Sequence, residues 1–204
     1  MRILMAAIIG ILLFTSSAYA SLEEGRAAYQ KQDWVNAVKF LRPLAEEGND
    51  QALVLLGNMY NDGKGVEQNH AVAFQHYKQA LTSGNDNAML AIATMYAEGL
   101  GTEKDFPAAF EWFKKSAEAG NPAAQFMIAS FYLNGHAELP DVKPDIVKSY
   151  AWYRITARQD RLPDMAAAGK ELARRLTAQL SPDQILQGEA IADEFYKTDQ
   201  EPSE

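Results

Sequence analysis

Residues 85–120 read NDNAMLAIATMYAEGLGTEKDFPAAFEWFKKSAEAG, and residues 49–84 before them read NDQALVLLGNMYNDGKGVEQNHAVAFQHYKQALTSG. The two segments share an Asn-Asp start, a tyrosine, paired glycines and a closing glycine, each displaced by 36 residues. A third copy begins at residue 121 and has a lengthened loop across residues 136–144. Self-similarity at a fixed period of about 20–50 residues is the signature of a repeat protein.

Each period predicts a pair of helices. Asn is a good N-cap, and glycine ends helices in the left-handed conformation, so Asn85 and Gly99 bound the first helix of their unit. No segment alternates between apolar and polar residues over any length, so a sheet is not supported. In each first helix a small residue, Gly57, Ala93 or Ala129, lies between two large side chains and lets a neighbouring helix approach closely. The recurring structural positions are Leu56, Gly57, Tyr60 and Gly63, then Ile92, Ala93, Tyr96 and Gly99, then Ile128, Ala129, Tyr132 and Gly135.

Residues 25–37, before the first full period, are similar to a tetratricopeptide repeat. In the units that follow, Leu56-Gly57 with Tyr60 and the paired glycines Gly63 and Gly65 resembles the Sel1-like repeat family, a relative of the tetratricopeptide repeats. The resemblance implies an all-α fold, a right-handed α-solenoid of tetratricopeptide/Sel1-like helix pairs. A C-terminal helical cap is expected as well, because solenoid ends need one and residues 181–184, Ser-Pro-Asp-Gln, form a capping box.

The first twenty residues have the pattern of a secretory signal peptide: a basic start, an apolar run over residues 3–14 and a small-residue cleavage motif at 18–20. Twelve helical residues span about 18 Å, short of a bilayer core of about 30 Å. We therefore expect cleavage after Ala20 and an exported protein, periplasmic or secreted. The expected organisation is a signal peptide (1–20), four repeats within 21–160 (about 22–48, 49–84, 85–120 and 121–160), capping helices (161–197) and a disordered tail (198–204).

Composition excludes several kinds of chemistry. The formal net charge is −8 with no basic cluster, which argues against nucleic acid as a partner. Cysteine is absent and only three histidines are present, none with the spacing of a metal site, so we predict no metal and no cofactor. The paired glycines do not form a phosphate-binding loop, because the rest of that motif is missing. No serine lies in a nucleophile elbow, and we predict no catalytic residues.

A binding face is predicted on the first helices, which line the concave surface if the units are oriented as in tetratricopeptide repeats. Three small polar residues share one repeat position and suit hydrogen bonding to an extended peptide or a partner helix, or are plain solvated positions. Three apolar residues share another position and either line the groove or lie buried between helices. The candidate partner-binding residues are Val54, Asn58, Asn61, Leu90, Thr94, Phe126 and Ser130.

A repeated period without a catalytic constellation favours a binding scaffold. The resemblance has the same implication, since Sel1-like proteins generally mediate protein–protein interactions. The sequence therefore predicts a non-catalytic, exported adaptor in the bacterial cell envelope, with another protein or peptide of the envelope or extracellular space as its partner. After signal cleavage we expect no stable membrane insertion. The alternative is a protein that binds peptidoglycan fragments or hydrolyses the cell wall, although the cysteines of secreted relatives linked to cell-wall antibiotic binding are missing here.

Overall fold

The computed structural model describes residues 21–198, and within that range every regular element is helical. The predicted all-α class is therefore confirmed, with consecutive helices packed in pairs. The chain divides into two compact units, one of residues 21–88 with 99–103 and one of 89–98 with 104–198. The predicted signal peptide and residues 199–204 lie outside the described range. The last helix reaches Thr198, one residue further than expected.

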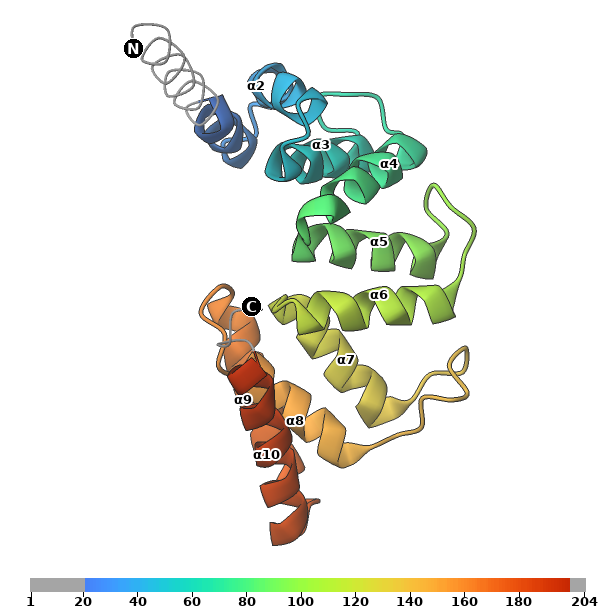
Figure 1. The fold of residues 1–204 in the computed structure, drawn as a ribbon, viewed down its shortest axis with the longest axis vertical. Helices are drawn as coiled ribbons and strands as arrows, with labels where there is room; N and C mark the ends of the chain where they lie inside the picture. Colours follow the sequence, from blue (N-terminus) through green and yellow to red (C-terminus); the bar gives the residue numbers. More distant parts are fainter. Residues whose placement is uncertain (1–20, 199–204) are drawn as a thin grey trace, which may run out of the picture. The chain divides into compact units, whose positions relative to one another are not determined.

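The first unit contains the helical residues 21–30, α2 (Trp34–Glu46), α3 (Asp50–Asp62), α4 (His70–Ala80) and the short 3₁₀ turn η1 (Leu81–Ser83) (Figure 1). The first turn of α5 (Asp86–Glu98) also belongs to this unit. Helix α3 packs against α2 on one side and α4 on the other. The core of the unit consists of small and branched apolar side chains, including Leu41, Leu53, Leu56, Met59 and Ala80.

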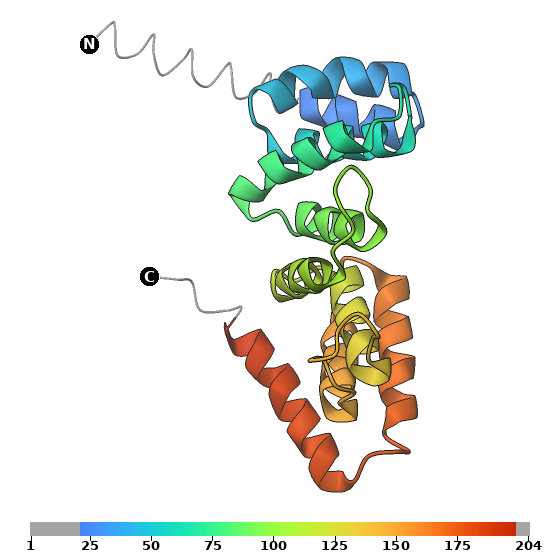
Figure 2. The same cartoon turned by 90° about the vertical axis from the view of Figure 1, so that its right-hand side faces the viewer.

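The second unit holds the rest of α5, then α6 (Phe106–Glu118), α7 (Pro122–Asn134), α8 (Ile146–Thr156), α9 (Pro163–Leu176) and α10 (Pro182–Thr198). Helix α7 packs on both α6 and α8, and α8 in turn contacts α9 and α10 (Figure 2). Two apolar clusters form its core. Phe113, Ile128 and Phe131 lie in one, and Tyr150, Tyr153 and Leu176 lie in the other.

The helix ends follow the periodic sequence. The Oδ1 atom of Asn49 accepts a 3.0 Å hydrogen bond from the Ala52 amide, and Asn85 caps its helix in the same way through Ala88. Gly63 ends α3 in the left-handed conformation, with φ of 69°. Gly135 departs from this pattern because its ψ of −177° turns the chain into the lengthened loop. These caps satisfy backbone groups that a helix end otherwise leaves without partners.

The recurring first-helix positions differ in depth. The apolar positions Leu56, Ile92 and Ile128 are buried, and the small residues beside them are buried as well. A Cβ atom on Gly57 would stand 2.6 Å from the Tyr77 ring, so glycine is required there for the close approach. The tyrosines at 60, 96 and 132 are only half-buried. The aromatic residues at the centre of the packing come instead from the second helices, namely Tyr77, Phe113 and Tyr153.

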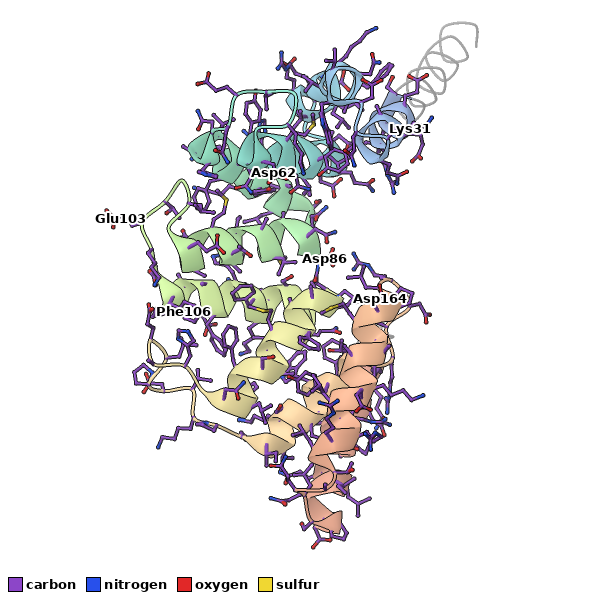
Figure 3. The ribbon with its side chains drawn as sticks, turned by 180° about the vertical axis from the view of Figure 1, so that it is seen from behind. Lys31, Asp62, Asp86, Glu103, Phe106 and Asp164 are labelled. Carbon is purple, nitrogen blue, oxygen red and sulfur yellow. The ribbon has the colours of Figure 1, made fainter. Side chains whose placement is uncertain are left out.

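The second glycine of the first two inter-helix loops contacts the start of the second helix of the preceding repeat. A Cβ atom on Gly65 would lie 2.7 Å from Cβ of Trp34, and one on Gly101 would overlap the backbone of His70. In the third loop, where glycine is replaced, the His136 ring stacks on Phe106 with centroids 3.8 Å apart. Phe106 begins α6, where Figure 3 labels it. Each inter-helix loop therefore packs against the start of the preceding second helix.

Candidate binding surfaces

The predicted polar row is engaged in contacts within its own helix pairs. Asn58 accepts a 2.7 Å hydrogen bond from the Tyr77 hydroxyl, and the Ser130 hydroxyl lies 3.1 Å from that of Tyr153. The third member, Thr94, donates to the carbonyl of Leu90 at 3.1 Å. All three polar side chains are half-buried. Asn58 and Ser130 therefore join first helices to second helices, and the role of the row in binding a partner stays a prediction.

The predicted apolar positions are also half-buried. Val54, Leu90 and Phe126 each pack against the core cluster of their own helix pair. Asn61 lies in the last turn of α3, and its Oδ1 is 3.0 Å from Nδ1 of His70 at the start of α4. The seven predicted residues fall in both compact units. Val54 and its equivalents contribute to packing, and nothing in their geometry tests a ligand-facing role.

A hollow in the first unit was not predicted from the periodic positions. It measures about 330 Å³ and lies where α2, α3 and α4 meet. Its floor is apolar, formed by Ala45 and Leu56, and its wall includes the stacked rings of Tyr60 and His76, whose centroids are 5.4 Å apart. Burial lowers the pKa of the His76 imidazole below its ordinary value, so the ring is neutral at pH 7. The remaining lining residues are polar: Arg42, Glu46 and Gln79.

A second, more apolar groove lies in the second unit between α8 and α10. It measures about 570 Å³ and is lined by Trp152, Ile155, Gln187, Ala190, Ile191, Glu194 and Phe195. The ring of Trp152 meets Phe195 edge to face, with centroids 5.6 Å apart. Ile191 keeps 36% of its surface exposed at this groove. The last helix thus has an incompletely covered apolar face.

An ionic cluster fixes α10 on α8 beside this groove. Glu189 accepts a 2.5 Å hydrogen bond from the Tyr150 hydroxyl. It also forms ion pairs with Arg154 and Arg158, at 2.8 and 3.5 Å. The Arg154 contact is purely ionic, since its Nε finds no acceptor in hydrogen-bonding geometry. Burial, followed by the bond to Glu189, raises the pKa of Tyr150 to about 12.

Two further searches of residues 21–198 bear on function. No group of three or more histidine and carboxylate side chains in this range gathers as metal ligands. Among the helices of the same residues, none is long and apolar enough to cross a membrane.

Comparison with known protein families shows which residues form the repeats. The Sel1 repeat model matches residues 50–85, 86–121 and 122–160, more than half of the chain. The chain belongs to the Sel1 repeat family. Sel1 repeat proteins generally act as protein-interaction scaffolds, and their fold is typically non-catalytic. No curated protein matches this Sel1 repeat chain.

Solved structures share the Sel1 fold. A Sel1 repeat protein from Oxalobacter formigenes is 26% identical, with a TM-score of 0.59, and the match covers 67% of this chain and 55% of that one. A protective antigen of uropathogenic Escherichia coli strains that displays an SLR fold is 20% identical, with a TM-score of 0.57, covering 92% of this chain and 49% of that one. The second likeness concerns the fold alone. Our chain spans about half the length of both structures.

Two features of these surfaces escaped the sequence reasoning because they break the period. His76 stands 36 residues before Trp112. It therefore occupies a repeat position where the next repeat has tryptophan, and its ring at the hollow is smaller. Ile191 belongs to α10, which lies outside the matched repeats and has no equivalent to compare. A search for departures from the repeat, rather than for recurrences, would have found His76.

Proposed function

We propose that this protein is an exported Sel1 repeat scaffold of the bacterial cell envelope that binds another protein without catalysing a reaction. The observation that supports it most directly is the run of three consecutive Sel1 repeats, a unit that generally serves protein–protein interaction. Export rests on the signal-peptide pattern of residues 1–20 alone. The proposed partner is a protein or peptide of the periplasm or extracellular space.

The apolar groove between α8 and α10 is the surface that we propose for the partner. Contiguous exposed apolar surface marks interaction sites on soluble proteins. A groove between two helices receives the apolar face of a third helix, with side chains entering at every third or fourth position. Trp152 and Phe195 supply aromatic surface at its base, the residue type that dominates binding energy in interfaces. We therefore assign it to an amphipathic helix of the partner.

Cross-linking in envelope extracts tests this function. The tagged protein is compared with Ile191→Glu, which places a charge in the groove, and with the matched control Leu186→Glu. Leu186 is also on α10 and 67% exposed, but it does not line the groove. A protein captured by the wild type and the control but lost by Ile191→Glu supports the proposal. Equal capture by all three moves the binding surface elsewhere, and capture of no protein argues for a glycan or small-molecule ligand instead.

Export has its own test. Intact-mass measurement of the protein recovered from a bacterial host should give a chain that begins at Ser21, because cleavage is expected after Ala20. Periplasmic extracts should contain that form. A full-length chain confined to the cytoplasm would contradict export without touching the scaffold proposal.

A further inference from the structure

The hollow of the first unit contains charged groups that no other side chain engages within residues 21–198. Arg42 and Glu46 are four residues apart on α2, the spacing at which oppositely charged side chains usually pair on a helix. Among the described residues, however, neither one forms an ion pair. Gln79 and the Tyr60 hydroxyl also lack a side-chain hydrogen-bond partner in the part of the chain that the structure describes.

The second unit shows which side chains occupy the same repeat positions there. Two periods further on, Lys114 and Glu118 replace Arg42 and Glu46, and these two side chains do form an ion pair, at 3.9 Å. The position of His76 is taken there by Trp152, which packs against the core cluster of that pair.

The floor of the hollow has equivalents as well. Ala45 and Leu56 correspond to Ala117 and Ile128, which lie in the cluster that Trp152 covers. In the first unit the smaller ring of His76 leaves this floor open. The hollow therefore coincides with a smaller ring at position 76 and, among the described residues, with an unpaired set of charges.

The geometry points to a binding site for a short zwitterionic peptide of two or three small residues with free termini. Arg42 would bind the terminal carboxylate and Glu46 the terminal ammonium group. The two side chains are one helical turn apart, about 6 Å along α2, and an extended dipeptide spans at most about 7 Å. Gln79 and Tyr60 can hydrogen-bond the peptide amides, while Ala45 and Leu56 receive small apolar side chains.

Size and charge state agree with this ligand. A volume of about 330 Å³ lies at the small end of ligand pockets, which suits two or three small residues better than a long peptide or a folded partner. The neutral imidazole of His76 adds no charge to compete with the terminal ammonium group. The site is independent of the proposed scaffold function, because it lies in the other compact unit from the α8–α10 groove.

Calorimetric titration of the purified protein with L-alanyl-L-alanine tests the site. We expect saturable binding that weakens at least about tenfold when the amino end is acetylated or the carboxyl end is amidated. Free alanine, which is too short to bridge both charges, should bind at least about tenfold more weakly than the dipeptide. Equal binding of the dipeptide and the blocked forms, or no binding of the dipeptide, overturns the proposal; equal binding of free alanine overturns the peptide assignment.

Variants locate the site on the protein. Arg42→Gln and Glu46→Gln should each weaken dipeptide binding at least about tenfold, whereas the double variant Lys114→Gln/Glu118→Gln, at the equivalent positions of the second unit, should leave it unchanged. His76→Trp introduces the residue found at the equivalent position of the two repeats that follow, Trp112 and Trp152, so it should fold and abolish binding. Its fold is checked by circular dichroism and its thermal midpoint. Dipeptide binding that survives in folded His76→Trp overturns the assignment to this hollow, while partner capture by the same variant tests the scaffold function separately.

Discussion

The Tyr77 hydroxyl donates a 2.7 Å hydrogen bond to Oδ1 of Asn58, joining the second helix of a repeat to the first. The same tie recurs between Tyr153 and Ser130 in the last repeat. In the middle repeat the equivalent aromatic residue is Phe113, and the facing hydroxyl of Thr94 turns to its own backbone. Helix pairs of the same chain thus have or lack this hydrogen bond, depending on whether the second-helix residue is tyrosine or phenylalanine.

This tie predicts opposite consequences for two conservative changes. Tyr77→Phe removes the donor from a buried position, so the free energy of unfolding should fall by about 0.5–1.5 kcal/mol. Phe113→Tyr supplies a hydroxyl facing Thr94, and it should be tolerated within about 1 kcal/mol because the new group finds a partner. Urea unfolding followed by circular dichroism measures both. A loss of several kcal/mol in Phe113→Tyr would show that Thr94 cannot accept the hydroxyl.

The ionic cluster at α10 should contribute measurably to stability. Glu189→Ala leaves the Tyr150 hydroxyl without its acceptor and Arg154 without its ion-pair partner, while Arg158 keeps its contact with Asp193, and we expect a loss of about 1.5–3 kcal/mol, as for hydrogen bonds to charged groups. Lys197→Ala on the same helix is the control, since the ion pair of Lys197 with Glu194 is exposed and 3.9 Å long. Equal losses for the two variants would mean that Glu189 does not anchor α10.

Gly101 should be far less replaceable than Gly84. Both residues have a φ of about +70°, so either change to alanine costs about 1–2 kcal/mol of backbone strain. A Cβ atom on Gly84 meets nothing within 4 Å, whereas one on Gly101 overlaps the His70 backbone. Gly101→Ala should therefore destabilise by about 1–3 kcal/mol more than Gly84→Ala. Thermal unfolding of the two variants under one buffer checks the difference, and equal midpoints would contradict the close contact.

Stability should fall as the solution is acidified, in part through His76. Burial lowers the pKa of this imidazole in the folded state, so the unfolded chain binds a proton first as the pH drops. The favourable contribution is complete above the ordinary histidine pKa of about 6.5 and is lost as the pH falls below it. Denaturant unfolding between neutral and mildly acidic pH should show a smaller decline in His76→Gln than in the wild type. Parallel declines would assign the effect to other groups.

Much of the fold was predictable because it depends on local rules repeated at a fixed spacing. Asn85 and Gly99 occur where helix ends need a capping oxygen and a left-handed residue, and the structure confirms both. The reciprocal bonds of Ser181 and Gln184 likewise confirm the predicted capping box. Such features depend on neighbours three or four residues away, which a sequence displays directly.

The candidate surfaces were less predictable because they depend on contacts between helices. Asn58 has the same sequence signature whether it faces a ligand or the Tyr77 hydroxyl, and only the packing of α3 on α4 distinguishes the two. Periodicity also directed attention to Tyr132 as a core residue, although it is half-buried and Tyr153 lies at the centre of the packing. The hollow beside His76 arises because the His76 ring is smaller than the tryptophan rings at the equivalent positions. A search for residues that the repeats share does not detect such a difference.

The loop contacts also limit which repeats are interchangeable. Gly65 and Gly101 each lie against the start of the preceding second helix through backbone proximity, which does not depend on the side chain found there. The third junction depends instead on a specific ring pair, His136 on Phe106. Exchanging the order of segments 49–84 and 85–120 would therefore preserve the first two junctions but bring His136 against His70. Two of the junctions therefore accept any preceding residue, whereas the third requires a phenylalanine ring for His136 to stack on. The final repeat consequently has a fixed place in the series.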